Sequence, residues 1–192
     1  MTYDGDMADP ATRVGATLAD YCAFEGEPGT RYELFNGEIV AMNQPTIQHG
    51  ILQMSLGAEL IRALDGRCAV VGPIGVYCQA TDEAFGPDIV VMCEAARYDP
   101  ILGRAVMNPS AVFEILSPTT SRIDTHEKLP SYKTIESLRE YVLVSQKKRL
   151  IQVHRRTKTG WTLEQVSAGT FRVCDAEVSV DAVYERLEKS AT

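Results

Sequence analysis

Two short runs of apolar residues stand out in the middle of the chain, and each contains one carboxylate. The first run is Pro87–Met92, with Asp88 near its start, and the second is Ala111–Leu116, with Glu114 inside it. Continuous apolar runs of this length are typical of central strands that are covered on both faces. Because a buried charge costs several kcal/mol unless it is paired or bound to a metal, both acids need a partner. The pattern favours one divalent cation shared by the two.

The residues before these runs predict a hairpin and a long helix. Asn36-Gly37 separates two apolar-rich segments, 31–35 and 38–42, which is typical of a β-hairpin. The segment 45–64 predicts a helix with two apolar stripes, one of which begins at Ile47 and the other of which contains Leu52 to Leu64. His49 falls within the second stripe. A helix that is apolar on two sides is expected to pack against the sheet and against another element or a second copy of the chain.

The remaining elements are shorter. The pattern predicts a single domain over residues 16–192 behind a loose N-terminal arm over residues 1–15. The predicted domain has an α/β fold, in which a mixed central β-sheet is flanked by helices. Helices are predicted at 16–24, 124–135 and 178–187; strands at 68–71 and 75–79, with a closing antiparallel set at 141–145, 150–154 and 161–166; loops or irregular connections at 81–86, 94–108 and 117–121.

Strand alternation places the two acids at one end of the sheet. Glu114 shares a face with Val112 and Leu116, whereas Phe113 and Ile115 point to the other face. If the run that begins at Asp88 lies next to this strand, the two carboxylates converge. Hard oxygen ligands of this kind suit Mg²⁺ or Mn²⁺, with water and substrate phosphate in the remaining positions. A metal held in this way can activate a water molecule and stabilise charge on a pentacoordinate phosphorus.

Composition limits the function classes. The formal net charge of the 192 residues is −7 and the pI is near 5.0, so no global positive field attracts nucleic acid, and any contact with a polyanion must be local. The five cysteines are scattered without a CxxC pair, which disfavours a thiolate zinc site and predicts a reduced, cytoplasmic setting. Neither a signal peptide nor an apolar run long enough to span a membrane is evident, so we expect a soluble protein.

An ordered set of short motifs resembles the Uma-two family of restriction-endonuclease-like proteins, within the PD-(D/E)XK nuclease superfamily. The motifs extend from about residue 31 to residue 144, most of the domain. Each is weak alone, and the ordered set is fairly specific. They are Tyr32-Glu33-Leu34, Asn36-Gly37-Glu38, His49, Pro87-Asp88-Ile89-Val90-Val91, Phe113-Glu114-Ile115-Leu116-Ser117-Pro118-Thr119-Thr120, Asp124, Lys128, Tyr132 and Glu140-Tyr141.

The resemblance implies a Mg²⁺- or Mn²⁺-dependent endonuclease acting on DNA. The homodimer is expected separately, from the second apolar stripe of the segment 45–64. The metal would be held by Asp88, Glu114 and Ile115. In the wider superfamily a lysine follows the glutamate by two residues, and here that position is Leu116. In similar proteins the lysine has moved to the next helix, where Lys128 matches.

The resemblance implies that Lys128 stabilises transition-state charge. It also implies that Glu33 is a further metal ligand or an acid that orients the water. It also includes His49 among the catalytic candidates.

Each of these residues also has a purely structural interpretation. Asp88 can cap backbone N–H groups at a strand start, and Glu114 can form a buried ion pair with an arginine such as Arg31 or Arg122. Glu33 can pair across the hairpin, Lys128 can be a solvated helix residue, and His49 can be a core histidine. A basic group can either follow a phosphate backbone or be a solvated hairpin edge; it comprises Lys147, Lys148, Arg149, Arg155, Arg156 and Lys158.

Two other functions therefore stay open. One is a catalytically silent dimeric module that keeps the fold and binds a protein or nucleic-acid partner. Leu116 in the lysine position and the acidic net charge favour it. The other is a phosphodiesterase that uses the same site on RNA or small nucleotides.

Overall fold

The structure is a computed structural model that describes residues 15–101, 103–116 and 127–190. The predicted arm lies almost entirely outside these residues, as do the predicted loop 117–121 and Asp124. The helices are α1 (Leu18–Ala23), α2 (Ile47–Leu64), α3 (Lys128–Lys133) and α4 (Val180–Ser190). The strands are β1 (Tyr32–Phe35), β2 (Glu38–Ala41), β3 (Ala69–Val71), β4 (Val76–Cys78), β5 (Glu83–Phe85), β6 (Ile89–Met92), β7 (Ala111–Leu116), β8 (Glu140–Ser145), β9 (Ile151–Thr157), β10 (Gly160–Val166), β11 (Thr170–Val173) and β12 (Ala176–Ser179).

A six-stranded mixed sheet forms the centre of the fold, with the strand order β10-β9-β8-β7-β6-β3. Only β7 and β8 pair in parallel, and the other neighbours in this sheet are antiparallel. Parallel neighbours need a crossover connection, and here α3 lies in the segment that joins them. The predicted α/β class, with a mixed sheet flanked by helices, is confirmed.

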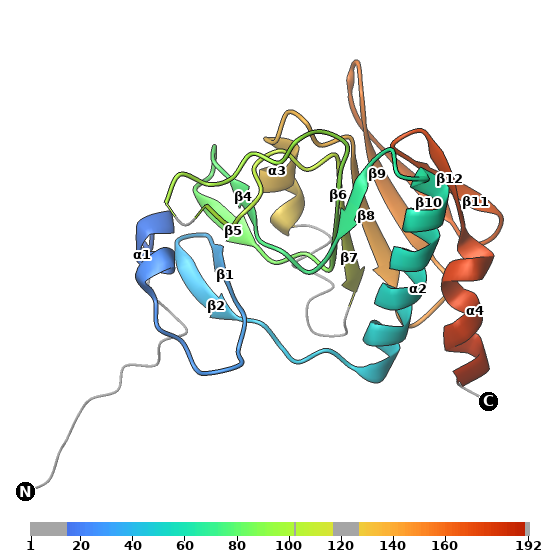
Figure 1. Cartoon of the computed structure of the whole chain (residues 1–192), viewed down its shortest axis with the longest axis horizontal. Helices are drawn as coiled ribbons and strands as arrows, with labels where there is room; N and C mark the ends of the chain where they lie inside the picture. Colours follow the sequence, from blue (N-terminus) through green and yellow to red (C-terminus); the bar gives the residue numbers. More distant parts are fainter. Residues whose placement is uncertain (1–14, 102, 117–126, 191–192) are drawn as a thin grey trace, which may run out of the picture.

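Different elements cover the two faces of this sheet (Figure 1). On one face α2 and α4 lie side by side, and their apolar residues join Val91, Phe113 and Val142 in the largest core cluster. On the other face α3 and strands β4 and β5 pack over Val112 and Leu143. Strands β4 and β5 belong to a second sheet with the order β2-β1-β5-β4. The sheet is therefore buried on both sides, as the two continuous apolar runs predicted.

Helix α2 buries one of its two apolar stripes. Its N-cap is Thr46, and it ends at Asp65, whose φ of 46° is in the left-handed region. The stripe that faces the sheet is fully buried and consists of Leu52, Leu56, Leu60 and Leu64. Three residues of the other stripe are exposed, namely Ile47 (80%), Met54 (74%) and Ile61 (61%). The homodimer expected from this second stripe stays a prediction.

Three elements differ from the sequence prediction. The segment predicted as the loop 81–86 contains β5, because Ala84 pairs with Leu34 and all three strand residues are buried. The helix predicted at 178–187 is preceded by the β11–β12 hairpin, so its first two residues are in β12. Among the described residues, helix α3 covers only part of the predicted range 124–135. Strands of three or four residues carry too little periodicity to be recognised from the sequence.

The expectation of reduced cysteines is wrong for one pair. Cys68 and Cys93 form a disulfide, with Cα atoms 4.1 Å apart, although 25 residues separate them in the sequence. The pairing of β3 with β6 sets Ala69 opposite Met92 and so brings the two cysteines together. The spacing along the chain gives no sign of this, because the pairing is created by the sheet. Cys22, Cys78 and Cys174 are free thiols.

No helix in the part of the chain that the structure describes is long and apolar enough to cross a membrane.

Candidate active site at the end of the central sheet

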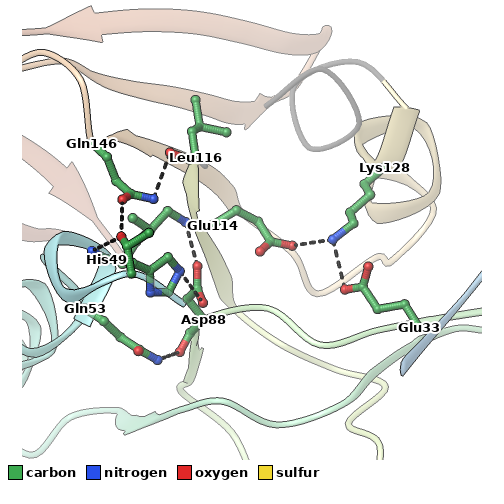
Figure 2. A network of polar contacts seen from close by, with 10 residues as sticks. Glu33, His49, Gln53, Asp88, Glu114, Leu116, Lys128 and Gln146 are labelled. Atoms are coloured by element: carbon green, nitrogen blue, oxygen red, sulfur yellow. Dashed lines mark hydrogen bonds and ion pairs between the residues drawn. The ribbon is translucent and has the colours of Figure 1, made fainter. Parts of the chain in front are cut away.

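The candidate residues meet at the end of the six-stranded sheet where β6 begins. Ile89 pairs with Phe113 and Val90 with Val112, so the same register, continued by one residue, sets Asp88 opposite Glu114. The parallel strands β7 and β8 both end here, at Leu116 and Ser145. Helix α2 reaches this end from one face of the sheet and α3 from the other (Figure 2). The predicted adjacency of the two acidic strands is therefore present.

Asp88 is held by four hydrogen bonds and lies almost completely buried. Its Oδ1 is 3.0 Å from His49 Nε2, and its Oδ2 accepts from the backbone N–H of Ile115 at 2.7 Å. Gln53 Nε2 donates to its carbonyl oxygen at 2.8 Å, and its own N–H donates to Phe113. The side chain thus binds a histidine and a backbone N–H that lies 27 residues away on the neighbouring strand, whereas the structural interpretation expected it to cap local N–H groups.

The loop between β3 and β4 also restricts Asp88. Gly72 lies so close that a Cβ atom there would overlap with the Asp88 carbonyl oxygen. Only glycine allows the chain to pass at this distance. The Asp88 backbone is therefore fixed from two sides, by Gln53 and by the loop around Gly72.

Glu114 and Glu33 share a lysine. Lys128 Nζ lies 2.9 Å from Glu33 Oε1 and 3.3 Å from Glu114 Oε1, and its side chain is only 4% exposed (Figure 2). Glu33 Oε1 also accepts from the backbone N–H of Gly86 at 2.8 Å. Lys128 is therefore not the solvated helix residue of the structural interpretation, and Glu33 does not pair across its hairpin. Among the residues that the structure describes, the crossover helix places an ammonium beside Glu114.

Two aromatic residues, Tyr132 and Phe85, contact this ion cluster. Tyr132, one turn after Lys128 in α3, donates its hydroxyl to Glu114 Oε1 at 3.3 Å. Burial raises the pKa of Tyr132 well above its usual value, and the Glu114 carboxylate raises it further, so the hydroxyl stays protonated and remains a donor. The Lys128 ammonium also lies 5.4 Å from the centre of the Phe85 ring.

The carboxylates of Asp88 and Glu114 supply part of the ligand set that a hard divalent cation needs. Asp88 and Glu114 present carboxylate oxygens from adjacent strands, and Mg²⁺ is commonly held by one or two carboxylates with water and phosphate oxygens. Within the described ranges, no group of three or more His, Cys, Asp or Glu side chains is arranged to hold a metal. Solvent and substrate would therefore have to complete the coordination. The structure gives Ile115 one contact here, the donation of its N–H to Asp88.

His49 is buried in the first turn of α2, where its backbone N–H donates to Thr46 Oγ1 at 3.1 Å. Its Nε2 contacts Asp88, and its Nδ1 is buried and has no hydrogen-bond partner among the described residues. The ring therefore orients Asp88 from the α2 side of the sheet.

The six basic residues noted in the sequence comprise arginines that bind protein groups and lysines that are exposed. Arg149 pairs with Asp181 and Glu188 of α4. Arg155 pairs with the buried Glu140, and Arg156 donates to three carbonyl groups, those of Lys133, Ile135 and Leu138. Lys147 and Lys148 are exposed in the turn between β8 and β9, at the end of the sheet where the acids lie. Lys158 is exposed in the turn between β9 and β10, at the opposite end. Only the first two lysines are therefore near the site.

Sequence reasoning missed three residues that hold this site together. Gln53 is four residues after His49 on the same helix face, a spacing that could have identified it. Gln146 accepts from Thr46 Oγ1 and donates to the Leu116 carbonyl, joining the start of α2 to the end of β7 (Figure 2). Glu83 is buried against α3. No sequence signal marks Gln146 or Glu83, because their partners are distant along the chain.

Comparisons with known proteins identify the family and the fold. A family model, Uma2, described as "Putative restriction endonuclease", matches residues 18–179. Two uncharacterised proteins of Synechocystis sp. are similar. The protein sll1609 is 28% identical over 138 residues, which are 71% of this chain and 78% of that protein, and slr1290 is 25% identical over 174 residues, 88% and 90% respectively.

A solved structure has a similar fold. It is the crystal structure of "a putative nuclease belonging to DUF820" from Anabaena variabilis, with a TM-score of 0.73 and 17% sequence identity. The match covers 89% of this chain and 98% of that one. At this identity the likeness concerns the fold.

Proposed function

Because this chain belongs to the Uma2 family of restriction-endonuclease-like proteins, we propose that it is an endonuclease that hydrolyses DNA phosphodiester bonds with Mg²⁺ or Mn²⁺. One observation carries the proposal. A buried lysine contacts Glu114 at the end of the sheet, on the strand next to Asp88. Two acids can hold a metal that assists phosphodiester hydrolysis, and an amine can stabilise the negative charge that develops on the phosphate. Here the amine comes from α3, and this arrangement supplies the cation that Leu116 cannot.

Each side chain has a role in this proposal. Asp88 and Glu114 would hold the metal, which supplies charge stabilisation and an acidified water molecule when bound. The Lys128 ammonium is placed to stabilise negative charge on a phosphate oxygen. Glu33 holds Lys128, and His49 orients Asp88.

The direct test is metal-dependent cleavage. Purified protein with Mg²⁺ or Mn²⁺ is expected to nick supercoiled DNA. Removal of the metal with EDTA is expected to stop cleavage, because the metal is proposed to acidify the attacking water and to stabilise charge on the phosphate. Parallel assays with RNA and a chromogenic phosphodiester define the substrate class. Cleavage that persists unchanged in EDTA would contradict the metal requirement.

The catalytically silent module is the second candidate, and one observation favours it. Asp88 and Glu114 each already bind protein groups, and among the described residues no larger set of metal-ligating side chains gathers there. Titration calorimetry with Mn²⁺ separates the candidates. A nuclease binds the ion at micromolar to millimolar concentration, whereas a silent module shows no binding heat.

The position of the exposed lysines supports a local path for DNA. The total charge of −7 repels a polyanion at long range, so contact must depend on cations beside the site. Lys147 and Lys148 fit this requirement, because they lie at the same end of the sheet as Glu114. We propose that they contact backbone phosphates of the bound duplex.

The double variant Lys147→Ala/Lys148→Ala is therefore expected to bind duplex DNA more weakly, with a salt dependence reduced by about two in log–log slope, because each lost contact releases about one counterion fewer. Fluorescence anisotropy with Ca²⁺ in place of Mg²⁺ measures this over roughly 50 to 200 mM salt. Lys158→Ala, at the opposite end of the sheet, is the matched control and is expected to bind like the wild type. Equal slopes for all three proteins would exclude this path.

A further inference from the structure

A buried carboxylate outside the proposed ligand set contacts both elements that hold Lys128 and Glu33. Glu83 lies in β5, is 4% exposed, and has no role in the chemistry described above. Its Oε1 accepts from the backbone N–H of Asn36 at 3.0 Å, and its Oε2 accepts from the hydroxyl of Ser131. A carboxylate buried to this degree is retained only where its hydrogen bonds offset the desolvation cost.

The two partners of Glu83 are close to the ion cluster in sequence. Asn36 follows directly after β1, three residues beyond Glu33, and its φ of 50° shows that the chain turns there. Ser131 is three residues after Lys128, and both side chains are buried. Residues three apart in a helix share a face, so the bond to Ser131 also fixes the direction in which Lys128 points.

Strand β5 makes a second contact with the same helix. Glu83 and Phe85 are alternate residues and share a face of the strand. The Phe85 ring lies under the Lys128 ammonium and 5.1 Å from the Tyr132 ring. The apolar contact alone would let α3 slide or rotate, whereas the Glu83–Ser131 bond has a defined direction.

We propose that Glu83 is a positioning residue, which fixes α3 against β1 so that the Lys128 ammonium lies between Glu33 and Glu114. It touches neither substrate nor metal and acts through Ser131 and Asn36. The consequence for catalysis rests on the proposed nuclease function, while the consequence for the position of Lys128 does not. A displacement of about 1 Å in such an amine is enough to reduce a reaction rate by about 10²-fold.

The test compares Glu83→Leu, which removes both bonds, with Glu83→Gln, which keeps the shape and can both accept and donate. Val183→Ala in α4 is the control for lost stability, because Val183 is fully buried in the core cluster on the opposite face of the sheet. Reductive methylation followed by mass spectrometry measures the accessibility of Lys128, which is only 3% exposed. Cleavage kinetics give kcat and KM separately.

We expect Glu83→Leu to raise the labelling rate of Lys128 by at least about tenfold well below the melting temperature, and to lower kcat by about 10²-fold with little change in KM. We expect Glu83→Gln to stay close to the wild type, and Val183→Ala to change neither quantity. Unchanged labelling in Glu83→Leu, or equal labelling in Val183→Ala, would overturn the proposal. If the wild type cleaves no phosphodiester, the proposed function fails, and the labelling still decides the role of Glu83.

Discussion

Replacement of Glu114 by glutamine is expected to reduce DNA cleavage by at least roughly 10³-fold, because it removes one of the two anionic oxygen donors proposed for the metal. Asp88→Asn is expected to have an effect of the same size. The loss is large because the two side chains serve one centre, so removal of either disables it. A nicking assay with Mg²⁺ and with Mn²⁺ measures the rates.

These two substitutions change charge with little change in shape, so the fold can be monitored separately. Glutamine at position 114 can still accept a hydrogen bond from Tyr132, which limits the structural consequence. Glu164→Gln is a suitable control, because Glu164 is exposed in β10, away from the acids. Circular dichroism should match the wild type for all three variants. Wild-type cleavage by both Glu114→Gln and Asp88→Asn would remove the nuclease assignment.

Replacement of Lys128 by methionine is expected to have the largest effect on stability. The ammonium is buried between Glu33 and Glu114, and all three side chains are at most 11% exposed. Removing one partner from a buried ion pair leaves the remaining charge uncompensated, which typically costs about 3–5 kcal/mol of unfolding free energy. Urea denaturation in EDTA measures this loss.

The same variant tests whether the Lys128 ammonium neutralises the carboxylates of Glu33 and Glu114. Without Lys128, Glu33 and Glu114 are expected to attract a divalent ion more strongly, so Mn²⁺ should stabilise Lys128→Met by at least about 1 kcal/mol more than it stabilises the wild type. The control is Lys133→Met in the same helix, whose ammonium faces Trp161 and not the acids. An equal effect of Mn²⁺ on Lys128→Met and the wild type would mean that the lysine does not shield the acids. Cleavage by Lys128→Met is expected to be lost.

Predictions made from single elements were the most successful. The hairpin around Asn36-Gly37 and the helix with Leu52 to Leu64 are both present, because a turn with positive φ and a 3.6-residue periodicity are local properties. The apolar runs around Asp88 and Glu114 form neighbouring central strands. Short strands such as β5 were missed, because their stability comes from pairing with distant strands.

The partners of the acidic residues were only partly predictable. Lys128 was identified by resemblance, and its contact with Glu114 follows from the crossover geometry of β7, α3 and β8. The shared metal was inferred because a buried acid needs compensation, but the structure also offers protein partners. Asp88 binds His49 and a backbone N–H, while Glu114 binds a lysine and a tyrosine. Each buried acid does need a partner, and protein groups as well as a metal ion can be that partner.

The sequence by itself determined the fold class, the family and the two strands that carry the acids, because periodicity, turn residues and ordered motifs are properties of the linear chain. Only the tertiary structure decided which groups meet at the end of the sheet. The Cys68–Cys93 bond, the contact of Glu33 with Lys128 across 95 residues, and the burial of Glu83 against Ser131 all depend on strand order and register. Such contacts have no local signature, because each partner acquires its role only when distant segments pack together.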